Sequence, residues 1–122
     1  MKERDEELFK RFKQFAIAII LFTKKFPKAQ EYKTIQRQII DSASSCAANY
    51  RAASRGKSVA DFINKLKITE EELDETMFWL ELTVGLSEEW RADVTPLWKE
   101  GNELLSITVA SIKTSRQKKK KP

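Results

Sequence analysis

Residues 8–26 read LFKRFKQFAIAIILFTKKF, and this stretch decides the fold class. Large apolar side chains recur in it at alternating intervals of four and three residues: Leu8, Phe12, Phe15, Ile19, Phe22 and Phe26. That spacing places them on one face of a helix, which we predict from Asp5 to Lys25. Ile17 and Leu21 fall outside this face and form a second apolar one. A monomer does not need a second apolar face, so we predict that Ile17 and Leu21 form an oligomer interface.

A second helix is expected after Pro27, because proline cannot continue the first one. It should begin between residues 29 and 34 and end near Arg55, with Gly56 at the position that closes it. Its middle, residues 42–49, reads SASSCAAN. Small side chains allow a neighbouring helix to approach closely, and we prefer this interpretation to a functional role for the serines.

Two further helices are indicated by capping signals. Ser58 followed by Asp61 predicts the start of the third helix, whose apolar face continues to near Leu86. Thr95 followed by Pro96 predicts the start of the fourth, with threonine as the N-cap and proline at the first helical position.

Four helices joined by short links predict an all-α fold, an up-down-up-down antiparallel four-helix bundle over residues 1–114. Residues 115–122 contain no large apolar side chain, and we expect them to form a disordered basic tail.

The composition excludes most kinds of active site. The chain of 122 residues has no histidine and a single cysteine, Cys46. This excludes His-ligated metals, histidine general bases, disulfide frameworks and multi-cysteine metal sites. We therefore expect no enzyme activity, no metal and no cofactor, and an inert buried thiol at Cys46. The apolar run Phe15 to Phe22 has 8 residues, too few for a membrane span, so we expect a cytoplasmic protein with no membrane partner.

Charge is distributed unevenly along the chain. Residues 24–67 carry 10 basic and 3 acidic groups, residues 68–103 carry 2 and 11, and residues 104–122 carry 6 and none. The net charge is +5, of which four lysines of the tail supply +4. The contrast is explained either by complementarity between helices or subunits, or by a patch that binds a partner.

Basic residues around the junction of helices two and three, together with the tail, are the candidate nucleic-acid-binding residues: Arg51, Arg55, Lys57, Lys65, Lys118, Lys119, Lys120 and Lys121. The alternative is that these residues form a solvated surface and that the tail aids solubility. Within the acidic segment, Glu75 is expected to point sideways toward the second helix, near Asn49 or Arg51. The three tryptophans are expected to anchor the core rather than to stack on bases.

The same junction carries a family resemblance. Residues 45–58 read SCAANYRAASRGKS, residues 62–66 read FINKL, and residues 74–82 read DETMFWLEL. Together with Lys24-Lys25-Phe26-Pro27 at the end of the first helix, they resemble the four helix bundle protein family, also called the intervening-sequence or S23-type ribosomal-RNA-associated family. Its members include proteins encoded within insertions of bacterial large-subunit ribosomal RNA genes. The sequence is also similar to the accessory variability protein of diversity-generating retroelements.

This resemblance, which covers about residues 8–112, implies a homopentameric ring. In the retroelement relative, a basic ring works with a reverse transcriptase and nucleic acid. The sequence therefore predicts a non-enzymatic, homo-oligomeric bundle that acts as an accessory protein for RNA or DNA, with a reverse transcriptase as a potential partner. The alternative is a protein–protein adaptor with no nucleic acid role, which would use the acidic face of the third helix or the outer surface of the ring.

Overall fold

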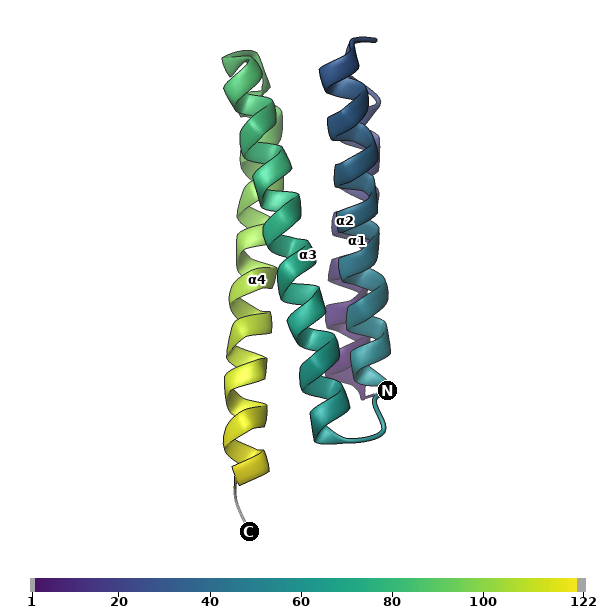
Figure 1. Ribbon diagram of the computed structural model, residues 1–122, viewed down its shortest axis with the longest axis vertical. Coiled ribbons are helices and arrows are strands. Elements are labelled where there is room, and N and C mark those ends of the chain that lie inside the picture. The colour runs from purple at the N-terminus through teal and green to yellow at the C-terminus, as the bar shows by residue number, and fades with distance from the viewer. Residues whose placement is uncertain (1, 121–122) are drawn as a thin grey trace.

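The computed structural model describes residues 2–120. Four long helices form an all-α bundle in which successive helices run in opposite directions (Figure 1). They are α1 (Glu3–Thr23), α2 (Gln30–Ser54), α3 (Val59–Leu86) and α4 (Arg91–Lys120), with a short 3-10 helix, η1 (Glu88–Trp90), directly before α4. The predicted four-helix fold is confirmed, and the starts of α2 and α3 lie where the sequence placed them.

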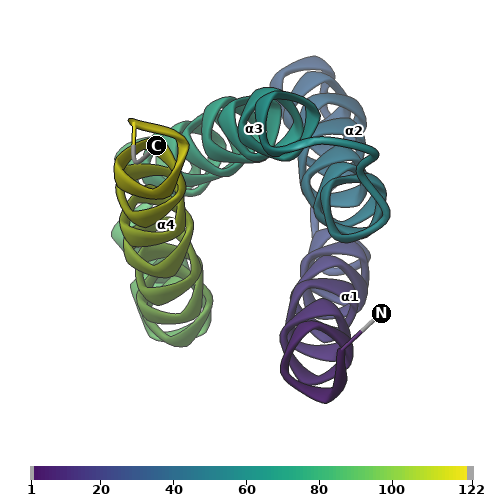
Figure 2. The same cartoon turned by 90° about the horizontal axis from the view of Figure 1, so that it is seen from below.

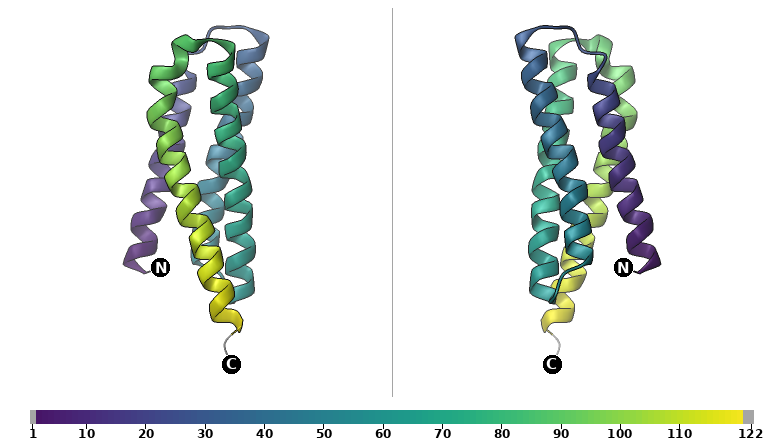
Figure 3. Two further views of the ribbon diagram at one scale, coloured as in Figure 1. Left: turned by 90° about the vertical axis from the view of Figure 1, so that its left-hand side faces the viewer. Right: turned by 90° about the vertical axis from the view of Figure 1, so that its right-hand side faces the viewer.

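The four helices are not equally close. Seen from one end, α2 and α3 form the base of a U whose arms are α1 and α4 (Figure 2). The contact between α2 and α3 is the most extensive, whereas that between α1 and α4 is much smaller. The first turns of α1 diverge from the other helices (Figure 3). The core is therefore built on the α2–α3 pair and closed by side chains from the two arms.

A seven-residue repeat in α3 explains its close contact with α2. Buried leucines alternate with buried threonines at heptad spacing: Leu66, Thr69, Leu73, Thr76, Leu80 and Thr83. Each threonine hydroxyl donates to the carbonyl four residues earlier, which satisfies it inside the bundle. Thr76 Oγ1 also lies 2.7 Å from Ser42 Oγ of α2. The small residues of α2 thus serve helix packing, as predicted.

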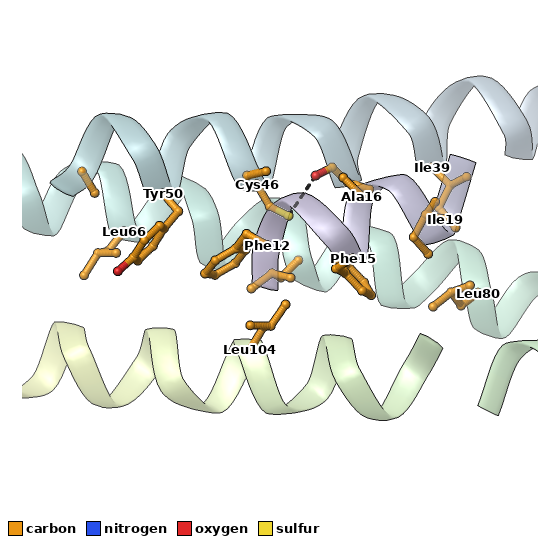
Figure 4. Close-up of a cluster of buried hydrophobic side chains, with 14 of the residues drawn as sticks. Phe12, Phe15, Ala16, Ile19, Ile39, Cys46, Tyr50, Leu66, Leu80 and Leu104 are labelled. Carbon is orange, nitrogen blue, oxygen red and sulfur yellow. Dashed lines mark hydrogen bonds between the residues drawn. The ribbon is translucent and has the colours of Figure 1, made fainter. Parts of the chain in front are cut away.

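Phe12 of α1 fills the space between the arms. Its ring stacks on Tyr50 of α2 with centroids 4.7 Å apart, and the two lie beside Leu66 and Leu104 in the core (Figure 4). Burial raises the pKa of the Tyr50 hydroxyl above its usual range, with a further contribution from Asp5. Large aromatic rings from α1 therefore bridge a gap that smaller side chains would leave open.

Gly101 lets α4 approach α1 and α3. A Cβ at this position would lie 2.7 Å from Met77 Sδ and 3.1 Å from Phe15 Cζ, so any larger side chain must displace both neighbours. We expect Gly101→Val to lower the free energy of unfolding by about 1–3 kcal/mol, the usual cost of overpacking. Urea denaturation measures it. The matched control is Asn102→Val. Asn102 is exposed on the same helix, and asparagine and valine have similar helix propensities. Equal stability of the two variants would contradict the expected close packing.

An aromatic cluster closes the end of the bundle at which α1 turns into α2. Trp90 lies 5.7 Å from Phe22 and 5.3 Å from Phe26, centroid to centroid, in edge-to-face geometry. Its indole Nε1 donates to Tyr32 Oη at 3.0 Å. The cluster fixes the end of α3 and the start of α4 against the α1–α2 turn.

The predicted start of α4 at Thr95 was wrong. The helix begins at Arg91, directly after η1, and Pro96 lies inside it. Ser87 caps this segment through Glu89 N, and the Thr95 hydroxyl donates to the Arg91 carbonyl at 2.7 Å. Anchoring by Trp90 outweighs the local Thr-Pro signal.

The far end of α4 also differs from the prediction. Residues 115–120, expected to be disordered, continue the helix to Lys120. Lysine, arginine and glutamine have high helix propensities, and basic side chains in the last turn interact favourably with the helix dipole. Residues 121 and 122 lie outside the described part of the chain.

Among residues 2–120, no helix combines the length and the apolar character needed to cross a bilayer.

Candidate nucleic-acid interface

The two basic segments predicted from sequence meet at one end of the bundle. Because the helices alternate in direction, the turn from α2 to α3 and the C-terminal end of α4 both lie at the end of the bundle opposite the α1–α2 turn (Figure 1). The view from this end shows the α2–α3 turn and the end of α4 facing the viewer (Figure 2). We call this end the basic end; it comprises residues 51–67 and 113–120.

The α2–α3 turn is tightly built. Ser58 Oγ accepts a hydrogen bond from Asp61 N at 3.0 Å, which confirms Ser58 as the N-cap of α3, and Asp61 Oδ2 accepts from Lys57 N at 3.3 Å. A Cβ at Gly56 would lie 3.0 Å from the Ala53 carbonyl oxygen. Gly56 follows the C-cap of α2 as predicted, but its φ is not positive, so close approach rather than left-handed backbone favours glycine here.

Four predicted basic residues surround this turn. Arg51 lies in the last turn of α2, Arg55 is the C-cap of that helix, and Lys57 lies in the turn itself. These three are exposed, whereas Lys65, two turns into α3, is half-buried. The Arg51 guanidinium lies 5.6 Å from the centroid of the Phe9 ring, a cation–π contact that orients it.

The end of α4 supplies the second group. Lys118, Lys119 and Lys120 are exposed in its last turn, whereas Lys121 lies outside the described residues. Sequence reasoning missed two members, Lys113 and Arg116. They lie on the same side of α4 as Lys120, at i, i+3 and i+7, a periodicity that has meaning only once this segment is known to be helical.

The basic end has a clear excess of positive charge. Its two segments hold ten Lys or Arg residues and one acidic residue, Asp61. The ion pairs within residues 2–120 involve other cations, namely Arg11, Lys25 and Arg91. The start of α1 lies at the same end and is mildly acidic, since residues 2–7 carry two basic and four acidic groups. The cations of the basic end are thus available to a polyanion.

The expectation for Glu75 was wrong. Glu75 is exposed, and Glu72 takes the half-buried position instead. Burial raises the pKa of the Glu72 carboxyl, and the charges of Glu75, Glu71 and Asp41 raise it further. No group of three metal-ligating side chains is assembled here or elsewhere within residues 2–120.

Cys46 is buried between helices, as predicted. Its thiol donates to the Ala43 carbonyl at 3.0 Å, and burial raises its pKa to about 12. A thiol with this pKa is protonated at neutral pH, so Cys46 is unsuited to act as a nucleophile.

The tryptophans also occupy the structural places expected of them. Trp79, Trp90 and Trp98 are all partly buried against the core. Trp98 Nε1 donates to Glu81 Oε2 at 3.1 Å. None of the three indoles lies at the basic end, so contacts there would be made by charged side chains.

Ile17 and Leu21 lie on the side of α1 that faces away from the core of the bundle. Their exposed fractions are 38% and 54%, although both are large apolar residues. The structure therefore places the predicted interface residues on an accessible surface.

Comparisons with known proteins agree with this architecture. The profile of the 23S rRNA-intervening sequence protein family matches residues 4–110. The chain is similar to the crystal structure of a protein of unknown function from the S23 ribosomal protein family of Bacteroides thetaiotaomicron VPI-5482. That similarity has a TM-score of 0.81 at 31% identity and covers 89% of this chain and 97% of the other. No curated protein matches the sequence. The chain belongs to the 23S rRNA-intervening sequence protein family.

Proposed function

We propose that the protein is a non-enzymatic accessory protein that binds RNA or DNA through the phosphates at its basic end. The observation that carries this proposal is the convergence of two basic segments, far apart in sequence, at one end of the bundle. Lysine and arginine side chains bind the nucleic acid backbone by displacing condensed counterions, which requires no particular base sequence.

The contact is electrostatic rather than base-reading. Arg51, Arg55 and Lys57 project from a turn and the end of a helix, whereas a base-reading element must lie along a groove. Binding should therefore depend strongly on salt and weakly on sequence.

Self-association completes the proposal. The exposed apolar side chains of Ile17 and Leu21 support a homo-oligomer, and the resemblance to ring-forming relatives supports a pentamer in the cytoplasm. In an oligomer several basic ends can bind one polymer, which raises the overall affinity through avidity.

The test is to remove charge at the α2–α3 turn. Arg51→Ala/Arg55→Ala/Lys57→Ala should reduce the slope of log K against log salt on duplex DNA by up to about 2.7 units, at about 0.9 per phosphate contact. Fluorescence anisotropy with labelled RNA and DNA at several salt concentrations measures it.

The matched control removes the same charge from the opposite end. Lys28, Lys33 and Arg37 are exposed near the start of α2, and their replacement by alanine should leave the slope unchanged. Equal losses in both variants would show that total charge, not the basic end, determines binding. No binding by the unmodified protein at about 50 mM salt would overturn the proposal and favour the adaptor function.

A further inference from the structure

The outer side of α3 carries an apolar stripe that the bundle does not use. Phe78, Leu82 and Leu86 follow at intervals of four residues and have exposed fractions of 53%, 39% and 45%. Gly85 lies beside them, and a Cβ there would meet nothing within 4 Å. Glycine inside a helix is unfavourable, and no neighbour in its own bundle requires it here. A glycine in such a place allows another backbone to approach closely.

A cleft adjoins the stripe. It lies between the C-terminal part of α3 and the N-terminal part of α4, has a volume of about 600 Å³, and is lined in part by Val84, Gly85 and Trp98. Gly85 lies beside the stripe and also lines the cleft, so the two adjoin, and we call them together the α3 face. Ile17 and Leu21, both exposed on α1, form a second apolar surface, which we call the α1 face.

The charges around the two faces have opposite signs. Exposed carboxylates flank the apolar stripe of the α3 face, with Glu75 and Glu81 one turn from Phe78. The cleft itself is balanced in charge, because Arg91 and Lys99 line it together with Glu81 and Glu88, and Arg91 pairs with Glu88 at 2.7 Å. The negative charge of the α3 face therefore lies along the stripe. Exposed lysines flank the α1 face. Lys13 lies one turn before Ile17, and Lys24 lies one turn after Leu21. Pairing like faces of two copies would oppose lysine to lysine or glutamate to glutamate, whereas pairing unlike faces opposes lysine to glutamate.

We infer that the α1 face of one copy docks on the α3 face of the next. This inference rests on the self-association in the proposed function and names both of its surfaces. Leu21 lies near the end of α1 and Leu86 is the last residue of α3, and these two helices run in the same direction (Figure 1). Two copies standing side by side with parallel axes can therefore bring the faces together at the same height.

Such a contact is head-to-tail, because each copy uses a different surface toward each neighbour. A head-to-tail contact closes into a ring if its rotation closes, and a two-fold dimer cannot use it. Side-by-side copies would also turn every basic end to the same side of the assembly. The charges thus favour a head-to-tail assembly over a two-fold dimer. In that assembly the basic ends of all copies lie on one side.

Two face variants and their mixture test the inference, with light scattering on a size-exclusion column as the measurement. Ile17→Glu/Leu21→Glu removes the α1 face, and Leu82→Glu/Leu86→Glu removes the α3 face at the same spacing. Each variant alone should be a monomer of 14.2 kDa, the mass of one chain. Their equimolar mixture should form a dimer of twice 14.2 kDa, because one intact face of each kind remains. The control Ser44→Glu/Ala48→Glu, at exposed positions of α2, should keep the mass of the unmodified protein.

Every other outcome overturns the inference. A variant that dimerises alone shows pairing of like faces, a variant that keeps the parental mass places the interface elsewhere, and a mixture that stays monomeric shows that the faces do not bind each other. A monomeric parent also refutes it. Circular dichroism confirms that each variant is folded. Anisotropy with labelled RNA on the same preparations reports nucleic acid binding separately, so failure of the phosphate contact is distinguishable from failure of the interface.

Discussion

A chain that ends at Ser115 should bind duplex DNA with a much weaker salt dependence than the full chain. The truncation removes five basic residues, Arg116 and Lys118 to Lys121. At about 0.9 per neutralised phosphate, the slope of log K against log salt should flatten by up to about 4.5 units. Fluorescence anisotropy over a range of salt concentrations measures both chains. Equal slopes for the two would show that this segment does not contact the polymer.

The helical state of residues 116–120 sharpens this prediction. Lys113, Arg116 and Lys120 share one side of α4, whereas Lys118 lies on another. Replacing the three by alanine should therefore flatten the slope by about 2.7 units, and Lys118→Ala by less than about 0.9. If every lysine contributed equally wherever it lies on the helix, the segment would have to bind as an extended chain rather than as part of α4.

Periodicity predicted the helices well because it reports a physical requirement that holds along a whole element. The 4,3 spacing that buries Phe12, Phe15, Ile19 and Phe22 requires a helix, and the heptad repeat of α3 likewise extends over its buried face. Antiparallel topology then follows from the short links, and it alone brings the α2–α3 turn next to the end of α4. The convergence of the two basic segments was therefore within reach of sequence reasoning.

Single-residue signals were less reliable, because they compete with contacts distant in sequence. The Thr95-Pro96 pair is a strong local start signal, but Trp90 is anchored by Phe22, Phe26 and Tyr32, and α4 begins earlier. Glu72 and Glu75 differ by less than one helical turn, and only the rotation of α3 against α2 decides which is half-buried. Residues 115–120 have no apolar face, so periodicity carries no helix signal there, and only the high helix propensity of lysine, arginine and glutamine points to the helix.

The largest effect on stability is expected from Phe12→Ala. The Phe12 side chain is fully buried and stacked on Tyr50 at an interplanar angle of 17°. Its removal loses the transfer free energy of the ring and leaves a cavity, a combination that costs about 3–5 kcal/mol. Domains of ordinary stability have about 5–15 kcal/mol in total, so the variant should be close to unfolding. Urea denaturation should show its midpoint lowered by more than about 1 M.

The position of Phe12 makes this cost hard to relieve. Phe15 and Ile19 hold the next turns of α1 in the core, and the Arg11 to Glu100 ion pair at 2.7 Å holds α1 against α4, so α1 cannot move into the cavity without disturbing these contacts. The matched control is Phe78→Ala, which removes the same ring from a side chain that is 53% exposed and should cost at most about 1 kcal/mol. Both changes are best compared in the Ile17→Glu/Leu21→Glu background, so that assembly contributes equally. If Phe12→Ala were as stable as Phe78→Ala, the aromatic bridge between the arms of the bundle would contribute nothing, and the α2–α3 pair alone would determine the stability of the fold.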